Sequence, residues 1–246
     1  MNESRRVLKR IFIAVVYLAV FAGLGTGGYF FFRPASEPSV PSTPIATSIE
    51  IIWSDAFVSG PNLYSAAAQI KNPNTNFGAN FLRYSFYFYD ENETLLDSAT
   101  GDSFIWPGES KYIVLGGINL AKAPAKTILK IENPAWQEIE NFKGINLTVG
   151  NVSFKKEAGG SDKFFSVNFT ASNDTLFDLS RVYITAIVLD GDKMPIAAAS
   201  TLLENLKSKE NRPFLIPWFS AFPGMPAGVI LNISANLRET PALIGQ

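Results

Sequence analysis

The chain has 246 residues, of which 47% are hydrophobic and 13% aromatic, and its formal net charge is -1. This balance leaves no basic excess for binding nucleic acid. Cysteine and histidine are both absent, which excludes disulfides, thiol nucleophiles and every Ser-His or Cys-His catalytic arrangement. Zinc, blue-copper and haem sites with their usual ligands are excluded too, so we expect no cofactor. The missing cysteines favour a prokaryotic envelope.

The N-terminal segment predicts a membrane anchor. Residues 11–32 carry no charge and follow a basic tail, residues 1–10. A helix over residues 11–32 would be about 33 Å long, which matches the hydrocarbon core of a bilayer. By the positive-inside rule, the basic tail stays in the cytoplasm and everything after the helix lies on the extracytoplasmic side.

A cleaved signal peptide is the alternative for the same segment. Its apolar region would usually span 7 to 15 residues and end at a small-residue cleavage site. The run here is longer and ends in the aromatic sequence Tyr29-Phe30-Phe31-Phe32, with no A-x-A site before Arg33. We therefore expect a retained signal-anchor, a single transmembrane helix that contacts the lipid bilayer through residues 11–32.

A Pro/Ser-rich stalk is expected next, over residues 33–47. It contains four prolines interleaved with serine and threonine, at positions Pro34, Pro38, Pro41 and Pro44. Because proline fixes φ and favours extended polyproline II, this segment predicts a semi-rigid spacer.

The remaining sequence contains an internal repeat. Leu63–Lys71 is rich in strand-forming residues and leads to Asn72, and residues 164–171 do the same before Asn173. Residues 81–89 break at Asp90 and residues 182–189 break at Asp190, while Phe57 aligns with Phe154. Two copies of one domain, residues 48–140 and a divergent copy over residues 141–246, explain this pattern.

Each copy is predicted to be all-β. Short runs rich in Val, Ile, Phe, Tyr and Thr recur between Gly, Pro, Asn and Asp, without a long helical period. Phe86 and Phe88 are expected on one face of their strand and Tyr87 on the other. Asp190-Gly191 predicts a hairpin in which Gly supplies a positive φ and Asp bonds back to the turn. We expect two tandem immunoglobulin/fibronectin III-like β-sandwich domains behind one transmembrane α-helix.

One motif resembles a known family. Phe86-Tyr87-Phe88-Tyr89-Asp90 resembles the signature of the FxLYD domain, with Phe88 in the Leu place. Two flanking segments fit the same pattern, Lys71-Asn72-Pro73-Asn74 and Trp106-Pro107-Gly108-Glu109-Ser110. The second copy departs from it, because Asp190 follows Ala186-Ile187-Val188-Leu189 and Asn173 lacks a following proline.

The same pattern also resembles the related LEA14-like (WHy-type) β-sandwiches. The resemblance implies an extracytoplasmic, non-enzymatic β-sandwich, and it allows a stress-protective role in the envelope. It assigns no ligand, and fold analogy alone does not define activity.

An acidic segment is the one candidate for catalysis. It comprises Asp90, Glu91, Glu93, Asp97 and Asp102. Such carboxylates could bind Ca²⁺ or form a glycosidase-like pair, which would make the protein a membrane-tethered hydrolase. An acidic, solvent-exposed hairpin is the favoured interpretation, because no calcium-loop motif accompanies the cluster.

An aromatic segment near the C-terminus is a candidate partner surface. Phe214, Trp218, Phe219 and Phe222 lie among prolines and could anchor a partner. A core strand with a covered loop is the favoured alternative. We also expect Trp136, near the end of the first copy, to pack at the junction between the copies.

The sequence thus predicts a non-catalytic binding or scaffold protein of the cell envelope. Its expected partner is an envelope protein or glycan that the sequence does not identify.

Overall fold

The computed structural model describes residues 3–32, 46–157, 164–236 and 239. It divides into two compact units, Met1–Ile45 and Ala46–Gln246, and each is described by itself. Most of the predicted stalk, residues 33–45, lies outside the described residues.

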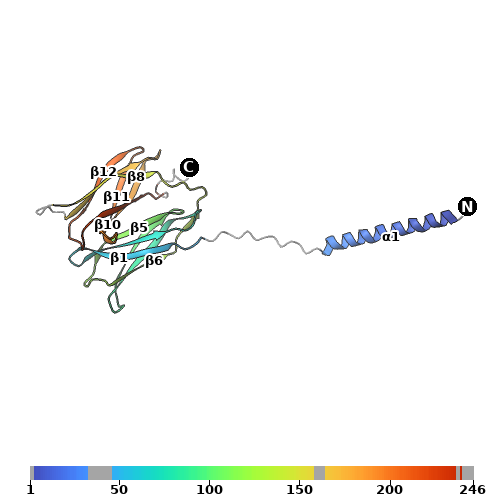
Figure 1. The fold of residues 1–246 in the computed structure, drawn as a ribbon, viewed down its shortest axis with the longest axis horizontal. Coiled ribbons are helices and arrows are strands. Elements are labelled where there is room, and N and C mark those ends of the chain that lie inside the picture. Colours follow the sequence, from blue (N-terminus) through green and yellow to red (C-terminus); the bar gives the residue numbers. More distant parts are fainter. Residues whose placement is uncertain (1–2, 33–45, 158–163, 237–238, 240–246) are drawn as a thin grey trace. The chain divides into compact units, whose positions relative to one another are not determined.

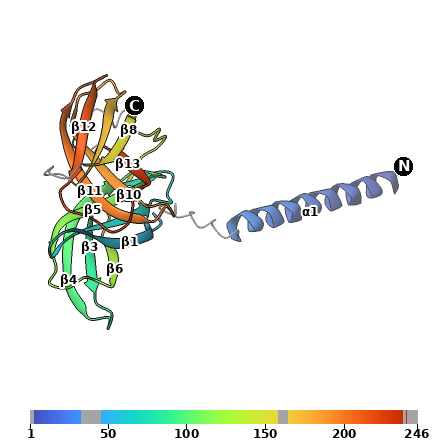
Figure 2. The same cartoon turned by 60° about the vertical axis from the view of Figure 1, so that its left-hand side comes forward.

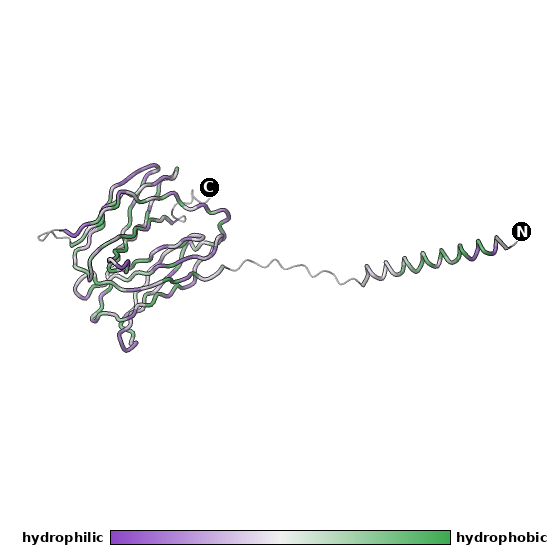
Figure 3. Tube along the Cα trace, viewed as in Figure 1, coloured by the Kyte–Doolittle hydropathy of each residue, from purple (hydrophilic) through white to green (hydrophobic). Residues whose placement is uncertain are grey.

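The first unit contains the helix α1, Glu3–Phe32. Its stretch Arg6–Tyr29 has a mean hydropathy of 2.1 and is long and apolar enough to span a membrane, alone in this respect among the described residues. Large apolar side chains are exposed all around it, including Leu8, Phe12 and Leu18, and Figure 3 shows the hydrophobic colouring along the helix. A helix that is apolar on every face is typical of a membrane span.

The second unit is built from antiparallel strands, which confirms the all-β prediction with one N-terminal helix. The strands are β1 (Glu50–Gly60), β2 (Leu63–Lys71), β3 (Phe77–Tyr89), β4 (Leu95–Ile105), β5 (Ser110–Asn119), β6 (Lys126–Glu132), β7 (Trp136–Glu138), β8 (Leu147–Lys156), β9 (Phe165–Asn173), β10 (Leu179–Leu189), β11 (Pro195–Leu206), β12 (Asn211–Trp218) and β13 (Gly228–Ser234).

These strands form two halves with the same sheet order. The first half pairs β1-β2-β5 in one sheet and β4-β3-β6 in the other, with β7 added to β3. The second half pairs β8-β9-β12 and β11-β10-β13, so β8 to β13 repeat the roles of β1 to β6. Figure 2 shows the two halves meeting where β5 lies beside β10 and β11.

Each half encloses its own apolar core between its two sheets. Phe86 and Phe88 of β3 are fully buried in the first core together with Leu82, as the alternation along this strand predicts. The second core contains Phe165 and Val167 of β9.

The two halves pack sheet against sheet. Phe57, Ala67 and Val114 on the outer face of β1-β2-β5 contact Ile187 and Ala198 on the outer face of β10-β11-β13. The sheet β1-β2-β5 is therefore covered on both faces, which explains why its strand β2 is apolar at successive positions rather than at alternate ones.

A tryptophan also joins the halves, but it is not the predicted one. Trp136 packs against the core of the first half. The indole Nε1 of Trp106 instead donates to the carbonyl of Ala235 at 3.1 Å, and the neighbouring Phe104 ring packs edge-on against Tyr183 at 5.4 Å. The prediction for Trp136 is wrong because β7 returns it to β3 of its own half.

The hairpin turns after β3 and β10 are copies of each other. Asp90 Oδ1 accepts from the backbone N–H of Asn92 and of Thr94, and Asp190 Oδ1 accepts from the equivalent groups two and four residues later. The left-handed residue is Lys193, with φ of 63°, and not Gly191. The aspartate prediction for this turn is thus confirmed, whereas the positive φ was assigned to the wrong residue.

A buried asparagine ties two turns together in the first half. The Nδ2 group of Asn72 donates to the carbonyl of Phe77 at 2.6 Å and to that of Trp106 at 2.9 Å. Its Oδ1 accepts from the backbone N–H and the side chain of Asn74. One side chain thereby fixes the β2–β3 turn against the β4–β5 turn.

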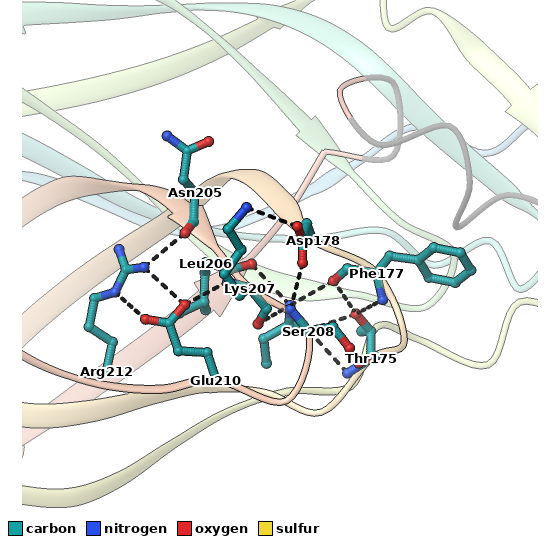
Figure 4. Close-up of polar contacts among 10 residues, drawn as sticks. Thr175, Phe177, Asp178, Asn205, Leu206, Lys207, Ser208, Glu210 and Arg212 are labelled. Atoms are coloured by element: carbon teal, nitrogen blue, oxygen red, sulfur yellow. Dashed lines mark hydrogen bonds and ion pairs between the residues drawn. The ribbon is translucent and has the colours of Figure 1, made fainter.

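Asn173 repeats this network in the second half, where Figure 4 shows its partners. Its Nδ2 donates to the carbonyls of Phe177, Leu206 and Lys207. Its Oδ1 accepts from both the backbone N–H and the hydroxyl of Thr175. Asparagine is required at both positions because a buried side chain must donate and accept at once.

We predict that Asn72→Ala and Asn173→Ala each lower the free energy of unfolding by about 3 kcal/mol or more, because each leaves several buried polar groups without a partner. Urea denaturation of the full chain in detergent, followed by tryptophan fluorescence, measures the change. The matched control is Asn76→Ala, which removes an exposed hydrogen bond to Glu138 and should cost less than about 1 kcal/mol. Equal losses in all three variants would contradict the networks' role.

Candidate ligand-binding cavity

A cavity of about 640 Å³ lies where the two halves meet. Residues of β3, β4 and β5 form its walls on one side, and residues of β10, β11, β13 and the segment after β13 form the other. Of the strands that carry these walls, β5 lies beside β10 and β11 in Figure 1. Ser200 and Leu202 on β11 are exposed, so the cavity opens to solvent there. Its volume suits a small organic ligand.

The wall from the second half carries polar side chains in cross-strand rows. Thr185 of β10 lies opposite Ser200 of β11 and Asn232 of β13. Tyr183, two residues earlier on the same face, lies opposite Ser234. Because alternate residues of a strand share a face, these rows line the cavity while Ile184 and Ala186 fill the core behind them.

Lys111 of β5 brings a positive charge into the wall of the first half. Only 4% of the residue is exposed. Its Nζ donates to the carbonyl of Phe104 at 3.0 Å and to the Ser234 hydroxyl at 3.4 Å, and it lies 3.5 Å from the centre of the Phe104 ring. Burial lowers the pKa of Lys111, and the charge of Glu109 opposes this shift.

Lys111 has no ion-pair partner within 4.0 Å among the described residues. Its hydrogen-bond acceptors are a carbonyl and a hydroxyl, both neutral. A buried ammonium group without a carboxylate is costly, since desolvation is repaid only in part by neutral partners.

Tyr84 of β3 also belongs to the wall from the first half. Its ring lies over Gly101 of β4, its cross-strand neighbour, and a Cβ at Gly101 would overlap the Tyr84 hydroxyl. Burial, together with the charge of Asp102, raises the pKa of Tyr84 to about 12. Asp102 is itself paired with Arg83 at 3.2 Å near the rim.

Two buried oxygen atoms at the cavity have no hydrogen-bond partner within the described part of the chain, Thr185 Oγ1 and Glu239 Oε2. The other oxygen of Glu239 accepts from the Tyr183 hydroxyl at 3.0 Å and lies 3.6 Å from an Arg181 nitrogen. Buried polar groups are normally satisfied, so these two atoms mark places where a ligand could bind.

The predicted acidic segment does not gather into a site. Asp90 caps its own turn and pairs with Lys122, and Glu93 pairs with Lys126. Backbone hydrogen bonds, most of all from Thr94, lower the pKa of Asp90. Asp97 and Asp102 lie on opposite faces of β4, because their positions differ by an odd number.

No group of three metal-ligating side chains occurs among the residues that the structure describes. The remaining member of the acidic segment, Glu91, is exposed in the turn after β3. The segment therefore offers a solvated hairpin with separately engaged carboxylates.

The predicted aromatic patch also does not form. Trp218 and Phe222 are buried in the second core, and each ring packs edge-to-face with the Phe165 ring at a centroid distance of 5.5 Å. Phe214 packs against the same core, and only Phe219 is exposed. The favoured alternative of a core strand followed by a covered loop describes this segment.

The residues of the FxLYD-like motif occupy structural positions. Asn72 and Asn173 hold turns, Phe86 and Phe88 lie in the core, and Asp90 caps a hairpin, as described above. Tyr89 ends β3 and Asp190 caps the hairpin after β10, while the others belong to the two turns linked by Asn72: Pro73, Asn74, Pro107 and Gly108.

The sequence matches no family model and no curated protein. Among solved structures, a variant of oxalate decarboxylase from Bacillus subtilis covers 81% of this chain and 80% of its own chain at 7% identity, with a TM-score of 0.10. A likeness at that TM-score carries no argument about fold or activity.

The cavity residues were missed at the level of sequence because strands far apart in the chain contribute them. One sequence signal was present: the charged residue Lys111 directly precedes the apolar run Tyr112-Ile113-Val114-Leu115. A lysine at the end of an apolar strand is usually solvated, so this signal alone does not indicate a buried charge.

The pKa of Tyr84 predicts a loss of stability at alkaline pH. In the unfolded chain a tyrosine ionises near pH 10, whereas native Tyr84 stays neutral up to about pH 12. The native state therefore binds more protons in this window, and the free energy of unfolding falls by about 2 to 3 kcal/mol as the pH rises through it.

Urea denaturation at pH values from 9 to 12 measures this effect. The alkaline fall in the free energy of unfolding should be about 2 to 3 kcal/mol smaller in Tyr84→Phe than in the native chain. In the control Tyr87→Phe, on the same strand, it should equal that of the native chain. Identical pH profiles for the native chain and Tyr84→Phe would refute the assignment.

Proposed function

We propose that this chain is a single-pass membrane protein of the cell envelope that presents a non-catalytic ligand-binding β-unit outside the cytoplasm. The observation that carries this proposal is the cavity between the two halves, which combines a buried cation with buried oxygen atoms that have no hydrogen-bond partner among the described residues. Groups of this kind cost stability unless something binds to them.

The anchor supports the location. The helix α1 exposes apolar side chains on every face, and basic residues lie only at its N-terminal end, before residue 11. The positive-inside rule then favours a cytoplasmic N-terminus. The ligand is proposed to be a small molecule or an end group of an envelope protein or glycan, since the cavity has a volume of about 640 Å³ and opens to solvent.

A binding role fits the chemistry better than catalysis does. Histidine and cysteine are absent, and the acidic residues of the β3–β4 hairpin are engaged one by one. The resemblance to FxLYD and LEA14-like domains is compatible with this role. A stress-protective function rests on that resemblance alone, and no contact described above favours it.

We predict that labelling of introduced cysteines reports the orientation cleanly, because the native chain has no cysteine. Ser98→Cys, at an exposed position of β4, should react with a membrane-impermeant maleimide in intact cells. Ser4→Cys, in the basic tail, should react only after the membrane is permeabilised. The reverse pattern would show that the orientation is wrong.

We predict that closing the cavity mouth abolishes ligand retention. Native mass spectrometry of the full chain, purified in detergent from its own cells, should show a bound small molecule. Ser200→Trp places a large ring at the exposed mouth and should reduce the bound fraction about tenfold or more.

The matched control is Ser98→Trp, at an exposed position of β4 that does not line the cavity, which should retain the ligand. Equal occupancy in both variants would mean that the molecule binds elsewhere. No bound molecule in any preparation, together with no binding to added small-molecule libraries, would overturn the proposed function.

A further inference from the structure

The internal repeat contains a built-in comparison for Lys111. In the second half, Arg212 occupies the equivalent position. Lys111 pairs with Ile70, two residues before Asn72, and Arg212 pairs with Ala171, two residues before Asn173. Each cation donates to a carbonyl of the preceding strand, and the two carbonyls are equivalent in the repeat. Lys111 donates to Phe104 at 3.0 Å, and Arg212 donates to the counterpart of Phe104, Asn205, at 2.8 Å.

The two cations differ in the carboxylate that they contact. Arg212 holds Glu210 through two hydrogen bonds, of 2.7 Å and 3.0 Å, from two of its nitrogens, as Figure 4 shows. Glu109 is the counterpart of Glu210 and makes the same backbone contact, accepting from Trp106 N–H at 2.7 Å. It forms no ion pair with Lys111 within 4.0 Å, although both residues are described.

Glu109 thus lies near Lys111 without pairing with it as Glu210 pairs with Arg212, and Lys111 is the cation that lines the cavity. Of its three N–H donors, two have acceptors, the Phe104 carbonyl and the Ser234 hydroxyl. An anionic oxygen in the cavity would give the ammonium its charged partner, and charge-assisted hydrogen bonds are the strong ones.

A second group lies within reach of the same anion. Thr185 is 9% exposed and its Oγ1 has no partner among the described residues. Thr185 is the diagonal neighbour of Ser234 across β10 and β13, and Ser234 accepts from the Lys111 ammonium, so both groups border the same part of the cavity. A carboxylate accepts hydrogen bonds at both of its oxygens and can therefore contact a donor with each one.

The charges around the cavity select a single negative charge. Asp102 and Glu239 line it, and each lies beside its own arginine at the rim. Lys111 is the one cation of the described cavity wall. With Asp102 and Glu239 each beside an arginine, Lys111 leaves one net positive charge, which a monocarboxylate balances and a phosphate, with its charge of about -1.5 to -2, exceeds.

Apolar side chains provide a place for the rest of such a ligand. Phe104 and Tyr183 form an edge-to-face pair on the cavity wall. Phe81 and Leu202 lie on the same lining, and Leu202 is exposed at the mouth. Ring faces and edges of this kind favour an aromatic or aliphatic body.

We propose that the cavity binds a small amphipathic monocarboxylate, with one carboxylate oxygen on the Lys111 ammonium, the other on the Thr185 hydroxyl, and the apolar body against Phe104 and Tyr183. This inference rests on the proposed binding function and names its ligand class. The carboxylate can belong to a free acid or to the C-terminus of a peptide, since both present the same two oxygens.

Two matched pairs of probes test the charge and its source. Phenylacetate and its neutral amide represent a free acid, and N-acetylphenylalanine and its amide represent a peptide end. Calorimetric titration of the full chain in detergent should give an affinity for at least one acid about tenfold or more above that for its amide. Preference for one acid over the other identifies the source.

Two variants locate the binding groups. Lys111→Met, which keeps the length of the side chain without its charge, should lower the affinity for the acid about tenfold or more and leave the amide unchanged. Thr185→Val, which is nearly isosteric, should lower it by a smaller factor of about fivefold. The exposed control Lys130→Met should bind as the native chain does, and the thermal melting of each variant reports whether it is folded.

The outcomes separate the two proposals. Equal binding of acid and amide, or full acid binding by folded Lys111→Met and Thr185→Val, would overturn the carboxylate inference while leaving a binding cavity that Ser200→Trp still closes. If Lys111→Met does not fold, Thr185→Val and the acid-to-amide ratio decide. Retention of a cationic or neutral native ligand in the native chain would also overturn the inference and keep the binding function.

Discussion

The sheet β1-β2-β5 has two apolar faces, and the rest of the β-unit depends on covering both. One face closes the core of its own half, and the other presents Phe57, Ala67 and Val114 to the second half. Burying such a face against Ile187 and Ala198 removes apolar area from water at roughly 25 cal/mol per Å². A single copy would leave this face exposed, so the duplication is a requirement of the sequence of the first half.

The cavity arises where that apolar cover stops. Along one face of β10 the residues change from Ile187, which packs against the first half, to Thr185 and then to Tyr183. Since every second residue shares this face, a change of chemistry at two positions opens a polar chamber without disturbing the core on the other face. The cavity therefore lies at the seam between the halves.

Local features could be predicted from the sequence, and features set by distant contacts could not. The turns at Asp90 and Asp190 follow from side chains that bond within four residues, so their chemistry is readable. The alignment of Phe57 with Phe154 is off by one residue: Phe57 pairs with Ser65, whereas Phe154 pairs with Val167, the counterpart of Ala66. A shift of one residue moves a side chain to the other face of its strand, so the two phenylalanines do not have the same role. The burial of Lys111 depends on a second half that no local pattern reveals.

The two copies show how one turn serves two purposes. Gly108, with φ of 66°, and Lys209, with φ of 60°, occupy equivalent positions, so the backbone imposes the left-handed residue even where glycine is absent. The turn before β5 begins with Trp106, which binds the other half, and the turn before β12 begins with Lys207, which pairs with Asp178 at 2.9 Å. Because the asparagine networks hold the backbone, the side chains of these turns were free to diverge. The same freedom separates Lys111 from Arg212: the repeat fixes where the cation lies, and Arg212 pairs with Glu210 within its turn, whereas Lys111 forms no ion pair with Glu109 and lines the cavity.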